Sequence, residues 1–427
     1  MSIPPLAFHL KPPVVHTDRC LNARHRQAGC TRCVDSCPTD AISLMTGPRP
    51  LPTIETTACV GCGACIVACP TDAFSEALQP ETKLLHLQEE FPADEAMGLT
   101  CPQQSAPDQT TAPIRYVIQH ERCLAAFSPE QLLSLSVDGG REVWMDDTPC
   151  KDCPIGKLHE ALLTNVAAAN RLLTSFRRPQ NIRLLTREPD IRQTTMHAVA
   201  VLQGAAPKVS RRGFFRSLGK LAKQRVDEAV QRAPMPLFSP GAPVDQRLPY
   251  HVPTSLQHLN EHLAQLAENA AVVPETGLET QGFPWADVRI SSDQCSGCQL
   301  CARFCPTGAL NYLWGESEGD TLFNITFHPA LCLECNICIA VCPEDAVMLT
   351  KTVVINELTA SEHKLLTAGY LVPCARCGTL TSPLPGEEAL CYVCRAPTMY
   401  RQNTQRSYLA GLAQELDRMI EGDEDAK

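Results

Sequence analysis

The sequence predicts an α+β chain of several domains: two cysteine-rich modules, a small α/β middle domain, and a C-terminal cysteine ribbon with a terminal helix. Three observations predict this fold. One cysteine spacing recurs four times, in two distant pairs, among 427 residues and 24 cysteines. Strand-like and helix-like segments alternate between the pairs, and two C-x2-C steps stand near the C-terminal end. The expected divisions are 1–80, 81–205, 206–285, 286–355, 356–400 and 401–427.

Charge and hydropathy limit the possible functions. The net charge is −10, which argues against nucleic acid as a partner because phosphate binding needs a basic face. The sequence contains no apolar run of roughly 18 residues, so no membrane span is predicted. Residues 1–10 lack the charge pattern of a secretory signal. Because reducing compartments prevent stable disulfides, we expect a cytoplasmic chain whose thiols bind metal.

Four copies of one cysteine motif define the two modules. Three copies read C-x2-C-x2-C-x3-C-P, and the first copy has extra residues after its opening cysteine. In bacterial iron–sulfur proteins with this spacing, the fourth cysteine binds the neighbouring cluster. We therefore expect four [4Fe-4S] clusters, held by Cys20, Cys30, Cys33 and Cys69, by Cys59, Cys62, Cys65 and Cys37, by Cys295, Cys298, Cys301 and Cys342, and by Cys332, Cys335, Cys338 and Cys305.

Both modules resemble bacterial two-cluster ferredoxins, and this resemblance implies a β-α-β-β-α-β fold and electron transfer. Two such modules on one chain, with extra residues between Cys20 and Cys30, are similar to the cytoplasmic accessory ferredoxins of periplasmic nitrate reductase systems. That resemblance implies a redox partner protein: a molybdenum-containing reductase or dehydrogenase, or its chaperone.

The middle region, 81–205, predicts a small α/β domain. Ser128-Pro-Glu-Gln131 is a capping box that predicts a helix start, and a longer helix is expected over 156–173. Strands are expected over 83–87, 143–145 and 182–185, with a turn over 138–140.

Four cysteines of the middle region predict a further site, because loops at strand ends are where α/β folds bind ligands. They are Cys101, Cys123, Cys150 and Cys153. Three interpretations remain open: a fifth iron–sulfur cluster, a redox-active pair at Cys150 and Cys153, or zinc or unliganded thiols. The pattern is similar to the small iron–sulfur subunit associated with viologen-reducing hydrogenases.

The remaining segments predict a linker and isolated helices. Residues 206–285 predict a Pro/Ala-rich linker with a basic helix over 214–232 and a second helix over 255–271. Arg211 and Arg212 resemble a twin-arginine export motif, but they stand at mid-chain. Two interpretations remain open: the start of an amphipathic helix, or a decoy of an export signal that is recognised by the chaperones of a partner enzyme. Residues 359–362 form another capping box, and 401–427 predict an amphipathic helix with an acidic tail.

The last four cysteines predict a metal site of their own. Cys374, Cys377, Cys391 and Cys394 have the spacing of a zinc ribbon. A mononuclear iron site is the alternative.

No motif predicts intrinsic catalysis, since the sequence has neither a nucleotide-binding fingerprint nor a nucleophile elbow. The first hypothesis is therefore a non-catalytic electron carrier or accessory subunit of an oxidoreductase. The second is an assembly or maturation factor for a molybdenum or iron–sulfur enzyme, in which clusters are donated instead of cycled. A nucleic-acid-binding regulator is disfavoured by the negative charge.

Overall fold

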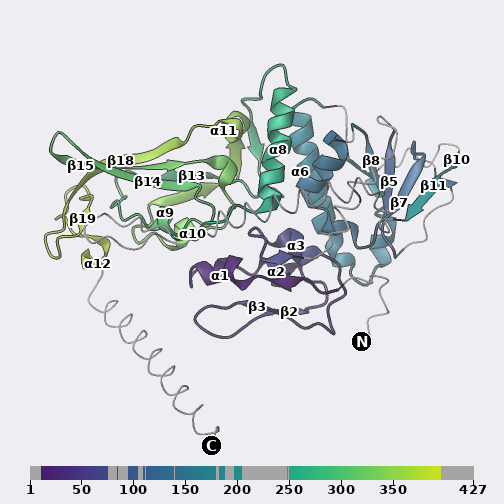
Figure 1. Ribbon diagram of the computed structural model, residues 1–427, viewed down its shortest axis with the longest axis horizontal. Coiled ribbons are helices and arrows are strands. Elements are labelled where there is room, and N and C mark those ends of the chain that lie inside the picture. Colours follow the sequence, from purple (N-terminus) through teal and green to yellow (C-terminus); the bar gives the residue numbers. More distant parts are fainter. Residues whose placement is uncertain are drawn as a thin grey trace, which may run out of the picture.

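The computed structural model describes residues 11–75, 84, 95–103, 109–110, 112–138, 140–178, 182–187, 197–203, 248 and 250–395. Figure 1 shows the first module lying along one side, the parallel sheet at one end and the second module with its long hairpin at the other. Helices α6 and α8 stand between the two ends. Within the described residues, no helix is long and apolar enough to cross a membrane.

The first module has the element order that its resemblance implied. Its strands and helices are β1 (Val14–Val15), α1 (Leu21–Arg24), α2 (Arg32–Ser36), β2 (Ile42–Leu44), β3 (Pro52–Ile54), α3 (Ala64–Ala68) and β4 (Phe74–Ser75). β1 pairs with β4 and β2 pairs with β3, both antiparallel. The extra element α1 comes from the residues that lengthen the first cysteine motif.

The middle region is built on a parallel sheet of five strands in the order β11-β7-β5-β8-β9. The elements are β5 (Met97–Thr100), β6 (Gln109–Thr110), β7 (Tyr116–Gln119), α5 (Pro129–Leu133), β8 (Val143–Met145), α6 (His159–Ser175), β9 (Ile182–Leu184), β10 (His197–Ala198) and β11 (Ala200–Gln203). The next two strands of this sheet along the chain, β7 and β8, lie on opposite sides of β5, so a topological switch point lies beside β5. The expected α/β alternation is observed here.

Local signals in this region are confirmed. Ser128 accepts the backbone N–H of Gln131, and the Gln131 side chain accepts the Ser128 backbone N–H, so the capping box starts α5. The strand over 143–145, the helix after residue 156 and the strand from 182 are also present. The strand expected over 83–87 lies outside the described residues, except for Leu84, which is helical and buried.

One hydrophobic core joins the middle sheet to the segment that precedes module 2. Helix α8 (Thr254–Glu268) buries Leu256, Leu259, Leu263 and Leu266, and this spacing places them on one face. They pack in the same core as Leu132 of α5 and Trp285. The described end of the expected linker is therefore packed structure, whereas the basic helix and the arginine pair lie outside the described residues, as does 401–427.

The second module repeats the first and extends it. Its strands and helices are β12 (Gly277–Glu279), β13 (Asp287–Ile290), α9 (Leu300–Phe304), β14 (Leu310–Ser317), β15 (Asp320–Phe327), α10 (Ile337–Ala340), β16 (Val347–Thr350), β17 (Thr352–Val354) and α11 (Ile355–Thr359). β13 pairs with β16, and β14 pairs with β15 across the Glu318-Gly319 turn. Both turn residues have positive φ, 54° and 93°, as tight hairpins require.

The capping box at 359–362 does not start a helix, so that expectation is wrong. α11 ends at Thr359, and the chain continues as β18 (Lys364–Pro373), which pairs antiparallel with β15. The long edge of β15 offers a ladder of backbone hydrogen bonds, and this tertiary pairing outweighs a local capping signal. β19 (Leu380–Thr381) and α12 (Tyr392–Arg395) follow in the ribbon.

Candidate cluster-binding sites and a candidate metal centre

Each cysteine motif folds into the same backbone shape. A loop carries the first two cysteines, a short helix carries the third (α2, α3, α9 or α10), and a Cys-Pro turn carries the fourth. The third residue after each fourth cysteine has positive φ: 54° at Asp40, 51° at Asp72, 74° at Gly308 and 51° at Asp345. This left-handed residue turns the chain into the next strand, which explains why Asp or Gly stands there.

The thiols of module 1 fall into the two groups expected from the spacing. Burial raises the pKa of Cys33 to about 12, and the thiols that also raise it are those of Cys30, Cys69 and Cys20. Although Cys20 is separated from Cys30 by α1, the fold returns it to the same group.

The second thiol group of module 1 lies on the side of the middle sheet. Burial raises the pKa of Cys62 to about 11, with Cys37 and Cys59 as its thiol neighbours. Cys65 has Cys62, Cys59 and Cys37 around it, and its pKa is raised by burial. The fourth cysteine of the first motif thus lies with the second motif, as the exchange pattern predicts.

Module 2 shows the same exchange. The buried Cys301 has Cys298, Cys295 and Cys342 as neighbours, and burial raises its pKa. Burial also raises the pKa of Cys332 to about 12, and the thiols of Cys335 and Cys305 raise it further. Cys338 is surrounded by Cys335, Cys332, Cys301 and Cys305.

Two of these thiol groups line cavities, and cysteine thiolates are the ligands that hold iron–sulfur clusters. Cys20, Cys30, Cys33 and Cys69 line one cavity with Leu44 and Phe74 among its walls, and Cys295, Cys298, Cys301 and Cys342 line another beside Ile325. Backbone N–H groups already point at ligand sulfurs: Ala73 donates to Cys69 Sγ and Ala346 to Cys342 Sγ, each at 3.3 Å. Such hydrogen bonds tune cluster potentials.

The middle cysteines gather at the carboxyl ends of the parallel strands. Cys101 directly follows β5, Cys123 lies beyond β7, and Cys150 and Cys153 lie beyond β8. All four line one pocket, together with Ile155, Leu158 and Leu162. This is the edge, beside the topological switch point, at which open α/β sheets bind ligands.

The middle pocket is tightly built around its thiols. Burial raises the pKa of Cys123, and its nearest thiols include Cys62 of module 1 as well as Cys150 and Cys101. Burial also raises the pKa of Cys150 to about 12. Gly156 passes so close that a Cβ there would meet the Cys150 carbonyl oxygen at 2.5 Å.

Two acids and a histidine support the rim of this pocket. His159 Nε2 and Asp147 Oδ2 form a hydrogen bond of 2.8 Å. Asp147 Oδ1 also accepts the Thr186 backbone N–H at 3.0 Å, and the Asp146 carboxylate accepts the Thr148 hydroxyl. These bonds hold the loop after β8 in place.

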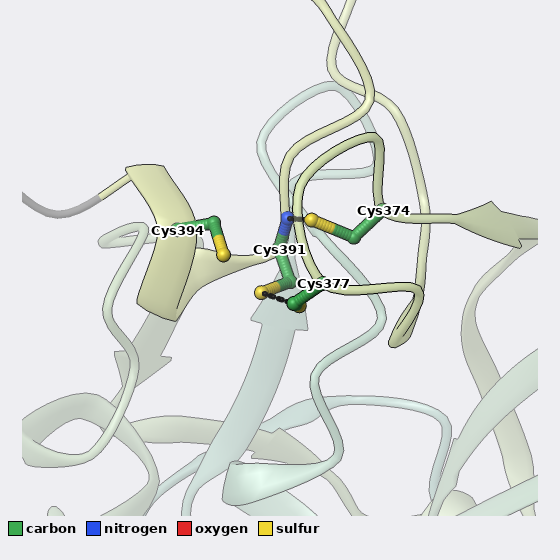
Figure 2. A group of neighbouring side chains, drawn as sticks. All are labelled: Cys374, Cys377, Cys391 and Cys394. Atoms are coloured by element: carbon green, nitrogen blue, oxygen red, sulfur yellow. Dashed lines mark hydrogen bonds between the residues drawn. The ribbon is translucent and has the colours of Figure 1, made fainter.

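The last four cysteines form a different kind of site. The sulfurs of Cys374, Cys377, Cys391 and Cys394 all lie within 4.8 Å of one another, and Figure 2 shows them grouped between α12 and the adjoining loops. Among the described residues, no other three His, Cys, Asp or Glu side chains are so close together. One tetrahedral ion needs such tight spacing, whereas thiols around a multi-iron cluster must stand further apart.

Backbone hydrogen bonds prepare this site for a metal ion. The Cys391 N–H donates to Cys374 Sγ at 3.3 Å, and this bond is the main reason that the pKa of Cys374 falls to about 6. Gly378, after Cys377, has φ of 75°, which the knuckle turn requires. Such thiols are deprotonated readily, which favours a metal ion.

Sequence reasoning missed two arginines that contact the cluster loops. Arg122 is 1% exposed and lies against the loop that contains Cys62, and Arg24 contacts module 2 from the inserted α1. Neither arginine belongs to a recognisable sequence motif, and only the packing of distant segments shows which loops they contact.

Comparison with known proteins identifies the two modules. The family model for the 4Fe-4S dicluster domain matches residues 28–73 and 294–346. The chain is 34% identical over 68 residues to NADH-quinone oxidoreductase subunit I of Pelobacter propionicus, over 14% of this chain and 34% of that protein. It is 40% identical over 62 residues to the polyferredoxin protein MvhB of Methanothermobacter marburgensis, over 14% of this chain and 15% of that protein.

These matches establish the two modules. The chain carries two 4Fe-4S dicluster domains, and the expectation of ferredoxin-type modules is confirmed. It spans only about a third and about a seventh of the lengths of the two relatives. Cys20 precedes the first matched segment, which starts at residue 28, because the insertion displaces it in the sequence.

Proposed function

We propose that the chain is a multi-cluster iron–sulfur protein that relays electrons to or from a partner redox enzyme, in the manner of a polyferredoxin. One observation carries the proposal: two dicluster domains and a further group of buried and half-buried thiols are packed together, with Cys62 of module 1 beside Cys123 of the middle pocket. Closely spaced clusters are the arrangement that electron relay requires.

The cofactor complement follows from the thiol groups. We assign one [4Fe-4S] cluster to each of the four groups in the modules, and these clusters would supply one-electron transfer. The cysteines hold them, and the N–H groups of Ala73 and Ala346 donate to ligand sulfurs.

We assign a fifth iron–sulfur cluster to the middle pocket and one zinc ion to the ribbon. The middle thiols line one pocket, and they are not part of the compact group of four sulfurs in the ribbon. The fifth cluster is preferred to a redox-active pair because Cys101 and Cys123 line the pocket together with Cys150 and Cys153. The ribbon sulfurs have the compact spacing of a mononuclear site.

The partner is proposed from resemblance and from the names of the relatives. One relative is named as a subunit of NADH-quinone oxidoreductase and the other as a polyferredoxin. A redox enzyme is therefore the proposed class of partner, with a molybdenum-containing reductase or dehydrogenase, or its chaperone, as the narrower proposal. A cytoplasmic location belongs to the same proposal.

Anaerobic purification and a redox titration test the relay. We expect iron and sulfide for the assigned clusters, one zinc per chain, and reversible reduction during which the iron content stays constant. Loss of iron to an apo-enzyme, with recovery of that enzyme's activity, would instead support the maturation role. A colourless oxygen-free preparation without bound sulfide would refute both.

A further inference from the structure

The residues between Cys20 and Cys30 form a built loop at the boundary between the two modules. They fold as α1, Leu21–Arg24, followed by a turn. The side-chain amide of Asn22 donates to the carbonyl oxygens of Cys30 and Pro50, each at 2.9 Å. Its Oδ1 accepts the Cys30 backbone N–H at 2.9 Å. These bonds fix the path of the inserted segment.

Arg24 makes the main polar contacts from this segment to module 2. Its Nε donates to the Phe304 carbonyl oxygen at 3.1 Å, and its Nη2 donates to the Cys305 carbonyl oxygen at 2.9 Å. Longer contacts of 3.4 and 3.5 Å reach the carbonyl oxygens of Leu248 and Arg303. The last carbonyls of a helix such as α9 have no partner within the helix, and a cation is favoured there.

Apolar side chains close the same boundary. Leu21 is 3% exposed and packs with Ile337 and Val341, which are 0% and 7% exposed. Cys30 of module 1 and Cys335 of module 2 both pack against this group. The cluster-binding loops of the two modules therefore meet here.

Two further contacts align the loops. Arg32, two residues after Cys30, donates from Nη2 to the carbonyl oxygen of Glu334 at 2.8 Å. The His25 ring meets the Phe304 ring edge-on, with 4.7 Å between centroids. Leu21, Arg24, His25 and Arg32 of module 1 thus contact module 2 around the cysteine loops.

We propose that this segment is a clamp that sets the position of one cluster-binding site against another, with Arg24 as the positioning residue. The two sites are those of Cys20, Cys30, Cys33 and Cys69 and of Cys305, Cys332, Cys335 and Cys338. The inference rests on the proposed relay, because the position of one site against the other matters only if electrons pass between them. With this contact in place, the four sites of the modules form one continuous row. It explains why the first motif is lengthened: the extra residues build the contact.

The test uses the full-length, cluster-loaded protein with Arg24→Ala, Arg24→Lys and the matched control Arg26→Ala, since Arg26 is exposed on the same segment. Two measurements are made. Hydrogen–deuterium exchange of the oxidised protein follows residues 300–306 and 335–341. Electron paramagnetic resonance of the reduced protein follows the broadening that arises between neighbouring paramagnetic clusters.

We expect Arg24→Ala to keep its iron, to exchange faster at both segments, and to lose the part of the broadening that crosses between modules. Arg24→Lys keeps the charge but not the planar fork, so it should fall between wild type and Arg24→Ala. Arg26→Ala should match wild type. A spectrum of Arg24→Ala that superimposes on wild type at equal iron content overturns the clamp.

A second variant covers loss of clusters in the first. Arg32→Ala removes the hydrogen bond to the Glu334 carbonyl oxygen, and it is used if Arg24→Ala loses iron. At full iron content, Arg32→Ala should also lose the part of the spectral broadening that crosses between modules. Unchanged exchange and unchanged broadening in Arg32→Ala would then overturn the proposal. Failure of the relay has a separate signature: wild type that is not reversibly reduced at constant iron content, while the exchange effect of Arg24→Ala persists.

Discussion

The guanidinium of Arg122, in the loop after β7, lies directly against the backbone of Gly63 in a cluster loop of module 1. A Cβ on Gly63 would come within 2.4 Å of Arg122 Nη1 and 2.9 Å of the Ala126 side chain. Gly63 stands between Cys62 and Cys65, and Arg122 directly precedes Cys123. The pair therefore joins a cluster loop of module 1 to the middle pocket.

Gly63→Ala is expected to separate these two sites. The residue has φ of 81°, where an alanine costs about 1 kcal/mol, and its Cβ would also displace the buried Arg122. We expect lower iron content and faster hydrogen exchange over α3 and residues 120–126. Gly319→Ala is the matched control, because Gly319 has φ of 93° but nothing within 4 Å of its Cβ position. Equal iron content in the two variants would contradict the prediction.

Arg122→Gln is expected to lower the reduction potential of one cluster. Burial dominates the raised pKa of Cys62, and the positive charge of Arg122 acts in the opposite direction. Removing a buried cation disfavours the more negative reduced state, by on the order of 50 mV for a one-electron couple. A potentiometric titration followed by electron paramagnetic resonance measures the shift. Arg115→Gln, at a side chain that is 78% exposed, should leave every potential unchanged, and an equal shift in both would count against the interpretation.

Cys123→Ser is expected to remove iron and sulfide from the middle pocket alone. Serine is a poor ligand for soft iron–sulfide centres, so the content should fall by one cluster while the four module clusters remain. Gln103 lines the same pocket, and the control variant Gln103→Ala should keep its full iron content. Iron and sulfide analysis of both variants decides the matter, and unchanged iron in Cys123→Ser would remove the fifth cluster.

Cys394→Ser is expected to remove zinc without changing iron. The four ribbon sulfurs lie within 4.8 Å of one another and are separate from the module cysteines, so one lost thiolate opens a closed tetrahedral site. Val393→Ala, at an exposed neighbour, should keep zinc. Metal analysis that shows iron instead of zinc in wild type would favour the mononuclear iron alternative.

The packing of α8 on α5 is expected to weaken as the pH rises. The hydrogen bond to Glu130 raises the pKa of His258 above its ordinary value, and the two groups lie 3.5 Å apart. Protonated His258 therefore stabilises the folded state below its ordinary pKa, and this contribution is lost as the pH rises through the raised pKa. Since His258 is half exposed, the effect is below about 1 kcal/mol.

Hydrogen exchange of α8 between about pH 6 and 8, corrected for the intrinsic rate, measures this effect. His258→Gln should abolish the pH dependence, and His363→Gln, which changes a ring that packs on His328, should retain it. A pH dependence that survives in His258→Gln would assign it to another group.

The sequence was sufficient wherever a structure is specified by neighbouring residues. The cysteine loops, the Cys-Pro turns and the capping box at Ser128 are local, and their structure follows from backbone chemistry. The alternation around the middle sheet also predicted its class. The capping box at 359–362 failed because pairing of β18 with β15 involves residues far away in the chain.

The arrangement of the sites could not be predicted in the same way. Cys101, Cys123, Cys150 and Cys153 share a pocket only because parallel strands end at one edge. The contact of Arg24 with Cys305 joins residues 281 positions apart, and no short-range pattern indicates such a pair.

The attachment of the ribbon has a consequence for any protein that binds it. β18 runs directly into Cys374, the Thr381 hydroxyl donates to the carbonyl oxygen of Ser296, and Arg395 pairs with Glu344. Ser296 and Glu344 flank Cys295 and Cys342, so the ribbon is braced against one cluster-binding site. A protein that docks on the ribbon would therefore be held at a fixed orientation and distance from that site.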